Sequence, residues 1–294
     1  MKIASLATAL LLCCLAGTLH AATPDVLVEG VNMPAWVSRD GRLEPLAIGA
    51  TLKASDEITT AEGSRVLLRL ADGSAVKLGE NARFVVGAAA QTRNGGNPLF
   101  QATLRVITGA FRFTTSALAK VRGQRDVTVR FPTVTAGVRG TDLWGKAAAE
   151  RDFVVLIEGR IGVRRGDEDE VSMSEARSLY DAPKGAPTPP LTRISPDLLA
   201  KYAAETEISA GSGAAQSGGR WKVTVAASES QSEALGAYDK LRTAGYAAAI
   251  APLSRDGKTR FVVRIANLAS ERDALQLALR LKLRLGFEAA SVSM

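Results

Sequence analysis

The chain has almost no side chains suited to nucleophilic or metal chemistry. Its 294 residues include two cysteines, Cys13 and Cys14, and a single histidine, His20. All three lie within the first 21 residues, so removal of a leader would leave neither residue type. A chain without Cys and His has no nucleophile–base pair built on them, no disulfide and no ordinary zinc site. We therefore expect no cofactor and no metal.

The N-terminus has the parts of a secretory signal peptide. Lys2 supplies a positive charge, residues 3–15 are apolar, and residues 19–21 offer a small residue before a cleavage point. One alternative is an uncleaved membrane anchor, although the apolar run is shorter than the ~20 residues of a spanning helix. Another is a lipoprotein, although neither cysteine follows the small residue of a lipobox. We predict a signal peptide over residues 1–21, a periplasmic location and no transmembrane span after cleavage.

Aromatic residues are scarce, at 5%, whereas glycine is frequent, at 27 residues. Frequent glycine favours tight turns and therefore short strands. A length of 294 residues predicts roughly two domains. The net charge is +7, and it is +6 without Lys2. A basic balance permits nucleic acid or an anionic surface as a partner, but it selects neither.

Residues 26–182 consist of short apolar runs separated by glycine, without a long helical period. Asp72-Gly73 is the residue pair of a tight hairpin, and it follows the apolar run at 66–70. Residues 104–107 precede Gly109, and residues 154–157 precede Gly159, each followed by alternating aromatic or β-branched residues. This repeated strand–turn–strand layout predicts an all-β domain.

The segments LRLADGSAVKLGENARF, RVITGAFRF, VRFPTVTAGVRGTDLW and VLIEGRIGV occur in the order of the FecR-like periplasmic domain, which this region resembles. The resemblance implies a compact, solenoid-like or sandwich-like β module. The best-known relatives regulate iron-transport sigma factors through a cytoplasmic N-terminal domain and a transmembrane helix. We expect this chain to lack both, which argues against signalling across the inner membrane.

The carboxylates Asp72, Asp142 and Glu158 are the candidates for catalysis in this domain. Each lies beside a glycine turn, so we interpret them as turn formers and solvated edges rather than as an acid–base pair. Several arginines could form a ligand surface, but a solvated strand face explains them better: Arg130, Arg139, Arg160, Arg164 and Arg165. We predict a protein that is not an enzyme.

Residues 183–219 form a linker rich in Pro, Gly and Ser. Ser195-Pro196 has the signature of a helix start, which predicts a short helix near 196–207. Residues 209–219 are rich in Gly, Ser and Ala and are predicted to be flexible. A second domain should begin at Arg220 and extend to Met294.

The pattern in residues 220–294 predicts the order βαββαβ. Strands are expected at 221–226, 246–252, 261–265 and 287–292, because apolar residues alternate there or follow turn signals. Ser230 and Ser270 are predicted N-caps of two helices that end at Gly245 and Gly286. Leucine alternates strictly over 275–285, as in a strand, but strong helix formers and the cap signals favour a helix.

The segments WKVTVAAS, LRTAGYAAAI and FVVRIANLASERDAL resemble the SPOR domain. The resemblance implies a four-stranded antiparallel sheet with helices on one face and an open face that binds peptidoglycan. Members of the family prefer glycan strands stripped of their peptides, and many collect at the division septum. The chain is thus expected to be multidomain, with an all-β domain followed by an α+β domain.

The parity of the strands identifies a candidate glycan-binding face. Side chains that alternate with the apolar positions should point away from the helices. They are Lys222, Thr224, Ala226, Arg260, Val262 and Arg264. The family commonly has Gln where this chain has Thr224, and Arg where it has Val262, so the affinity or selectivity for glycan is open. Without the resemblance, a generic solvated sheet face would be the better interpretation.

The leading hypothesis is an exported, non-enzymatic protein that binds peptidoglycan glycan strands and has a possible envelope or division partner. The alternatives are an envelope sensor that acts on a membrane or outer-membrane partner, and a peptidoglycan hydrolase. The hydrolase is disfavoured because no nucleophile, metal site or acid pair is predicted. Nucleic acid is also disfavoured, because the outward face lacks the aromatic residues on which bases stack.

Overall fold

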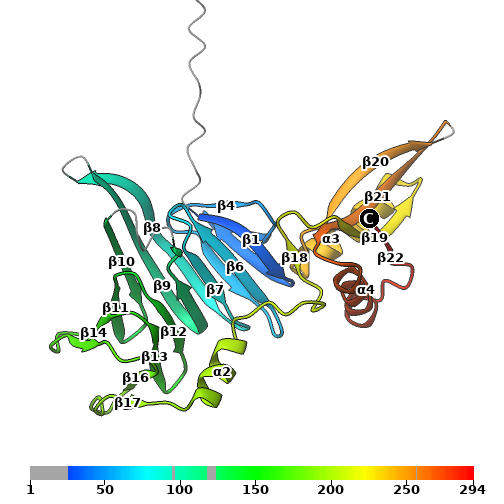
Figure 1. Cartoon of the computed structure of the whole chain (residues 1–294). Coiled ribbons are helices and arrows are strands. Elements are labelled where there is room, and N and C mark those ends of the chain that lie inside the picture. The colour runs from blue at the N-terminus through cyan, green and yellow to red at the C-terminus, as the bar shows by residue number, and fades with distance from the viewer. Residues whose placement is uncertain (1–25, 95–96, 118–123, 256) are drawn as a thin grey trace, which may run out of the picture.

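A computed structural model describes residues 26–94, 97–117, 124–255 and 257–294. It shows two domains and is mostly β-sheet with a few helices (Figure 1). The predicted signal peptide lies outside the described residues and stays a prediction. We call strands β1–β17 the β domain, and the elements β19–β22 with α3 and α4 the C-terminal domain.

The β domain consists of short strands joined by turns. Its strands are β1 (Val26–Asn32), β2 (Ala35–Arg39), β3 (Arg42–Pro45), β4 (Thr51–Leu52), β5 (Glu57–Thr60), β6 (Arg65–Leu70), β7 (Ala75–Leu78), β8 (Arg83–Asn94), β9 (Asn97–Thr114), β10 (Gln124–Arg130), β11 (Val134–Val138), β12 (Asp142–Ala147), β13 (Arg151–Glu158), β14 (Ile161–Arg165), β15 (Val171–Met173), β16 (Ser178–Pro183) and β17 (Thr192–Arg193).

The strands form two sheets that share β9. Sheet A contains β1, β4, β6, β7, β12, β13, β16 and β17, and sheet B contains β2, β3, β5, β8, β10, β11, β14 and β15. β9 pairs with β8 in sheet B up to Thr108 and with β7 and β12 in sheet A from Gly109 onward. Gly109 has φ +87°, and a Cβ there would lie 2.6 Å from the Cα of Ala82. Only glycine fits where the strand changes sheets.

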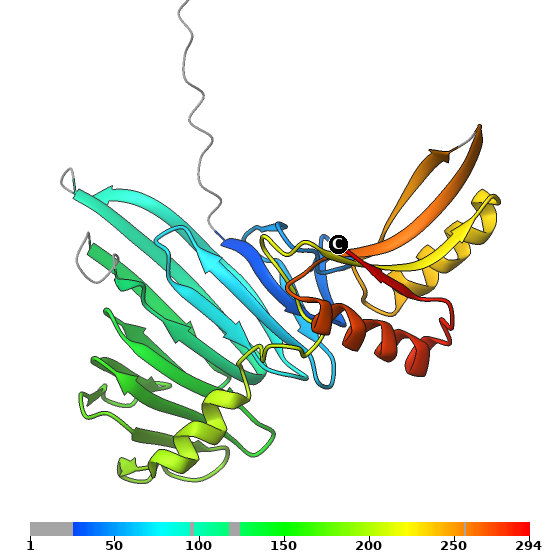
Figure 2. The same cartoon turned by 45° about the vertical axis from the view of Figure 1, so that its right-hand side comes forward.

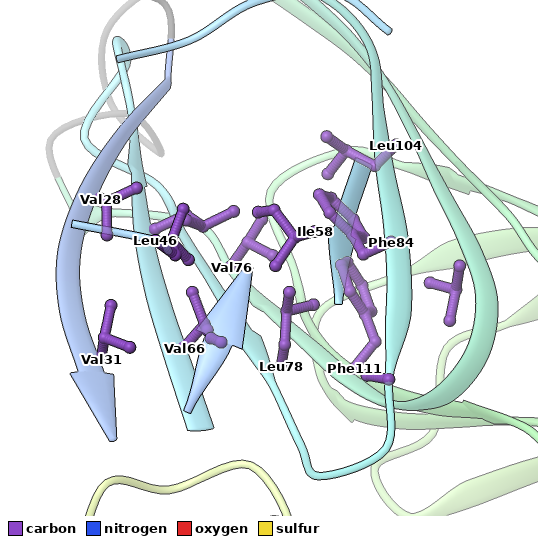
Figure 3. Packing of buried hydrophobic residues seen from close by; sticks show 14 of the residues in the cluster. Val28, Val31, Leu46, Ile58, Val66, Val76, Leu78, Phe84, Leu104 and Phe111 are labelled. Atoms are coloured by element: carbon purple, nitrogen blue, oxygen red, sulfur yellow. The ribbon is translucent and has the colours of Figure 1, made fainter. Parts of the chain in front are cut away.

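The core of the β domain lies between the two sheets. Phe84 from sheet B stacks on Phe111 from sheet A at 5.8 Å between ring centroids, and Phe131 meets Phe111 edge-on at 6.3 Å. Aliphatic side chains from both sheets, including Ile58, Leu78 and Leu104, pack in the same core as Phe84 and Phe111 (Figure 3). The alternating apolar positions in the sequence supply this core, because successive strand residues point to opposite faces.

Helix α2 (Pro196–Ala204) packs on the outer face of sheet A. The hydroxyl of Ser195 accepts a hydrogen bond from the amide of Leu198 and caps the helix. The ring of Tyr202 stacks on the fully buried indole of Trp144 at 4.3 Å. The Trp144 side chain therefore belongs to a separate small core under α2, not to the core between the sheets.

The C-terminal domain has the element order β19 (Trp221–Ser228), α3 (Gln231–Thr243), β20 (Ala249–Arg255), β21 (Lys258–Leu268), α4 (Glu271–Leu285) and β22 (Ser291–Ser293). All pairings are antiparallel, and the strands lie side by side as β20, β21, β19 and β22. The segment of alternating leucines is helical: Leu277 and Leu281 are buried in the core, and Gly286 ends the helix with φ +70°.

The segment 209–219, predicted to be flexible, is instead held between the two domains. Its strand β18 (Ala215–Gln216) pairs with β1 on one side and with β21 on the other. Ala215 faces Val31 and Leu268, and all three are buried. Figure 1 shows β18 between the two domains. The backbone hydrogen bonds on both sides make the sheet of the C-terminal domain continuous with sheet A.

Side chains reinforce this junction. The Arg280 guanidinium donates to the Oδ1 of Asn32 at 3.0 Å, to the Met33 carbonyl at 2.6 Å and to the Ser212 carbonyl at 2.6 Å. Gly245, at the end of α3, packs so closely on Trp36 that a Cβ would lie 2.5 Å from the indole. The helices of the C-terminal domain thus lie toward the β2 side of the β domain.

Candidate functional site

The sheet of the C-terminal domain has one covered face and one open face. Val223, Val263 and Ile265 are buried together with α3 and α4 residues such as Leu241 and Leu277. Both helices lie on this side of the sheet (Figures 1 and 2). We call the opposite side, which holds no helix among the described residues, the open face.

A row of polar residues crosses the open face. Arg264 on the central strand β21 lies opposite Thr224 on β19, and Thr224 lies opposite Ser291 on β22. Ala249 on β20 faces Arg264 from the other side. Ser291 and Ala249 are exposed, whereas Thr224 and Arg264 are half-buried. The row therefore presents a guanidinium and two hydroxyls across four strands, and we call it the polar row.

An apolar strip runs beside the polar row. Val262 lies between Ala251 on β20 and Ala227 on β19. Val262 is only 8% exposed, but it is not part of the main core, because it points to the open face. The two alanines are small, so their backbones are open to close approach by a ligand. Leu253, 51% exposed, and Arg260 extend the face toward the end of the hairpin.

The parity argument was wrong for one residue, Ala226. Residue Val225 is extra in β19 relative to β21, and this bulge changes the alternation. Ala226 therefore lies opposite Val263 and packs on the covered core, and Ala227 takes the predicted place opposite Val262. The run Ala226-Ala227 has no contrast between apolar and polar residues, so no signal in the sequence marked the bulge.

The cations of the open face differ in their surroundings. Arg260 lies 3.8 Å from Glu229, and both side chains are more than half exposed, so this pair contributes little. In the described part of the chain, Lys222 and Arg264 have no ion-pair partner. Lys222 is half-buried opposite Ser293 at the edge of the sheet. Arg264 and Lys222 thus keep their donors for a ligand.

The carboxylates considered for catalysis have structural contacts instead. Asp72 accepts hydrogen bonds from the amide and the hydroxyl of Ser74, both at 2.8 Å, as expected of a turn residue. Asp142 is 7% exposed, and Arg112 donates to its two oxygens at 3.0 and 2.7 Å. Glu158 is exposed at the end of β13. Among the described residues no cluster of His, Cys, Asp and Glu is suited to a metal ion.

The β domain has a crevice of about 780 Å³ between the β2–β3 hairpin and residues 47–53. At its rim Arg39 donates to both oxygens of the buried Asp56, at 2.8 and 2.5 Å. Desolvation raises the pKa of Asp56, but hydrogen bonds from Arg39 and from the Lys53 amide lower it more, so the pKa lies below the ordinary value. The pair ties the hairpin to the turn between β4 and β5.

Comparison with known families identifies both domains. The family model described as FecR protein matches residues 56–162, within the two-sheet β domain. The SPOR domain model matches residues 217–293, which include the whole open face. The chain therefore contains a FecR domain followed by a C-terminal SPOR domain. No curated protein matches the sequence.

Two crystal structures of a candidate anti-sigma factor from Parabacteroides distasonis ATCC 8503, at 1.65 and 2.50 Å resolution, are similar to the chain in structure. Each has 15% sequence identity and a TM-score of 0.40, and the match covers 50% of this chain and 64% or 63% of the other. This similarity is too low to indicate a shared function. No helix in the described residues is long and apolar enough to cross a membrane.

Proposed function

We propose that this chain is an exported, non-enzymatic protein that binds peptidoglycan through the open face of its SPOR domain. The SPOR match supports peptidoglycan as the target. The observation that carries the proposal is the open face itself. Ala227, Ala249, Leu253 and Ser291 are exposed on it, so no other described segment lies over this side of the sheet.

The chemistry of the open face suits a sugar polymer. The polar row offers donors and acceptors for hydroxyl groups, and the strip formed by Ala251, Val262 and Ala227 offers a flat apolar surface for the CH groups of a sugar ring. The preference for glycan from which the peptides have been removed rests on the SPOR resemblance. Denuded glycan strands are therefore the proposed ligand, and the septum is the proposed location.

Two side chains of the open face have less hydrogen-bonding reach than their counterparts in typical SPOR domains. Thr224 reaches less far than the Gln that the family commonly has, and Val262 offers no donor where Arg is frequent. We expect Arg264 to provide the main directional contact, because it lies at the centre of the polar row with its guanidinium unpaired in the described part of the chain. Arg264→Ala should lower the affinity about tenfold, since one charge-assisted hydrogen bond contributes roughly 1.5 kcal/mol.

The test is a pull-down of the mature chain on purified sacculi. Wild-type protein should be recovered from amidase-treated sacculi more efficiently than from untreated ones, and Arg264→Ala should lower that recovery. Arg193→Ala, which removes an exposed arginine of the β domain, is the matched control and should bind as wild type does. Equal recovery from both kinds of sacculi, or an unchanged Arg264→Ala variant, would contradict the proposal.

The FecR domain is proposed to be a structural or partner-binding module. A second candidate function is an envelope regulator of the FecR type that acts on a membrane or outer-membrane partner, and the FecR match favours it. N-terminal sequencing of the exported protein separates the two proposals, because a retained leader favours the regulator. Release of muropeptides from sacculi by the purified chain would refute the non-enzymatic assignment.

A further inference from the structure

Arginines gather on the outer face of sheet B, where β9, β10, β11 and β14 lie side by side (Figure 1). Arg105 on β9 lies opposite Arg130 on β10, and Thr135 on β11 lies between Arg130 and Arg164 on β14. All four residues are exposed. The residues that alternate with them fill the core between the sheets, so this row points to solvent. We call it the arginine row.

A row of small residues runs beside the arginine row. Thr128 on β10, Gly137 on β11 and Gly162 on β14 are register partners in succession. Within 4 Å, a Cβ at Gly137 would meet only the carbonyl oxygen of Gly162, at 3.9 Å. Arg139 and Arg160 are exposed on the far side of this row, where β11 ends and β14 begins. The two glycines therefore leave open backbone between arginines, and we call them the glycine strip.

The arginines of this face have few counter-charges. In the described part of the chain, Arg164 alone among them has an ion pair, with Glu170 at 3.9 Å, and the two side chains are 57% and 58% exposed. Asp126 is the other carboxylate exposed on this face. Like charges directly opposite each other, as in Arg105 and Arg130, are unfavourable on a sheet. An anion that contacts both arginines removes this repulsion.

The position of Glu170 shows which anionic group fits this face. Its carboxylate lies over Gly162, where a Cβ would overlap it, and next to Arg164. One carboxylate of the chain therefore already reaches the glycine strip and the arginine row together. Carboxylates suit this place because the planar guanidinium can donate two parallel hydrogen bonds to them.

We propose that the outer face of sheet B binds an extended acidic segment of a partner protein. Three strand spacings of ~4.8 Å separate Arg105 from Arg164, which makes the arginine row about 14 Å long. Alternate residues of an extended peptide are ~7 Å apart, so carboxylates at positions i, i+2 and i+4 match this length. The inference names a surface for the partner-binding role proposed for the FecR domain and rests on that role, but it does not depend on glycan binding.

Two other occupants are less favourable. A second copy of the chain carries the same net charge, +6 without Lys2, so two copies repel each other. A phosphate polymer would also be attracted to arginines, but the anion that lies on the glycine strip is the carboxylate of Glu170. The acidic peptide is therefore the occupant that the observations favour.

The test is fluorescence anisotropy at low salt with the full exported chain without its predicted leader. The probe is a labelled peptide of alternating Glu and Ser, and the control peptide has Gln in place of Glu. Wild type should bind the acidic peptide at least tenfold more strongly, and the double variant Arg105→Gln, Arg130→Gln should lose about tenfold. Arg42→Gln with Arg193→Gln removes two exposed arginines elsewhere in the β domain and should lose less than twofold.

Two further variants separate binding on the glycine strip from general attraction between charges. Gly137→Val leaves the charge unchanged and places a β-branched side chain where a Cβ has room, so the strand should persist. Because the new side chain covers the glycine strip, the affinity should fall about tenfold. Glu170→Gln removes the chain's own carboxylate from the strip and should raise the affinity about threefold. Asp169→Asn, an exposed neighbour in the same loop, is its control and should change the affinity little.

The proposal is overturned if the two peptides bind equally, or if the control double variant loses as much as Arg105→Gln with Arg130→Gln. Binding that persists in the arginine and Gly137→Val variants would refute this surface, yet leave the partner-binding role itself intact. Inorganic polyphosphate that binds more tightly than the acidic peptide and displaces it would assign the face to phosphate instead. Dimers in analytical ultracentrifugation that the arginine variant abolishes would assign it to a second copy. Recovery on sacculi should be unchanged in every variant, which keeps a failure here distinct from a failure of glycan binding.

Discussion

Replacement of Arg280 by methionine tests whether the two domains form one unit. The methionine keeps an unbranched apolar stem and a high helix propensity, so α4 itself should persist. It removes the guanidinium that donates to Asn32, Met33 and Ser212, which belong to two segments outside α4. Asn32 is only 5% exposed, so its Oδ1 is left without a partner and with little access to water.

The magnitude follows from these contacts. A hydrogen bond from a charged donor contributes roughly 1.5–3 kcal/mol, so three of them set an upper bound of about 9 kcal/mol. The net value is smaller, because burying the guanidinium has a desolvation cost, which also lowers the pKa of Arg280. We expect Arg280→Met to destabilise the junction by about 3 kcal/mol. Arg280→Lys should recover only part of this free energy. The planar guanidinium donates to three acceptors at once, and the smaller ammonium of lysine cannot reach all three.

Two measurements are made on each variant: unfolding in denaturant, and limited proteolysis of the folded chain. Wild type should unfold in a single transition, because β18 and Arg280 couple the domains. In Arg280→Met the C-terminal domain should unfold first, and the segment 209–219 should become a site of cleavage. Arg284→Met, four residues further along the same helix and exposed, is the control. If Arg280→Met keeps a single transition with the wild-type midpoint, the guanidinium does not hold the junction and the reasoning is refuted.

Two further substitutions test other contacts of the β domain. The pKa of Asp56 is lowered in the folded state, so its pair with Arg39 stabilises the fold at any pH above the ordinary carboxyl pKa. This stabilisation is lost as the pH falls through the folded pKa. Asp56→Asn should therefore lower the stability at pH 7, and the stability of the variant should depend less on pH below about pH 4. A thermal unfolding series against pH measures this, and an unchanged acid limb would exclude Asp56 as its source. Tyr202→Ala should weaken the packing of α2 on sheet A by about 2 kcal/mol, because the Tyr202 ring stacks on Trp144. It should also change the tryptophan fluorescence. If neither the emission nor the rate of proteolysis of α2 changes, the packing argument is contradicted.

Much of the local structure could be predicted from the sequence because its signals are local. Serine caps at Ser195, Ser230 and Ser270 begin the three helices α2, α3 and α4, and each hydroxyl accepts a hydrogen bond from an amide three residues on. The segments that resemble FecR and SPOR domains fall within the two family matches, except that Val163 lies one residue beyond the FecR match. Asp72-Gly73 forms the turn between β6 and β7.

The candidate site was only partly predictable. Thr224, Val262 and Arg264 lie on the open face as strand parity indicates, because each has its register partner on the same face. Ala226 does not lie on the open face, because β19 has a bulge at Val225. The bulge depends on the register between β19 and β21, which cannot be read from the sequence of one strand.

The sequence alone determined the elements: glycine-punctuated strands, capped helices and the alternation that separates the two faces of a strand, all of which depend on neighbours within a few residues. Only the tertiary structure decided how those elements meet. It placed β18 between β1 and β21, where composition indicated a flexible linker, and it left Leu275, Leu279 and Leu283 outside the core although Leu277 and Leu281 are inside. The physical reason is that pairing and burial depend on partners far away in the chain, and no local pattern specifies them.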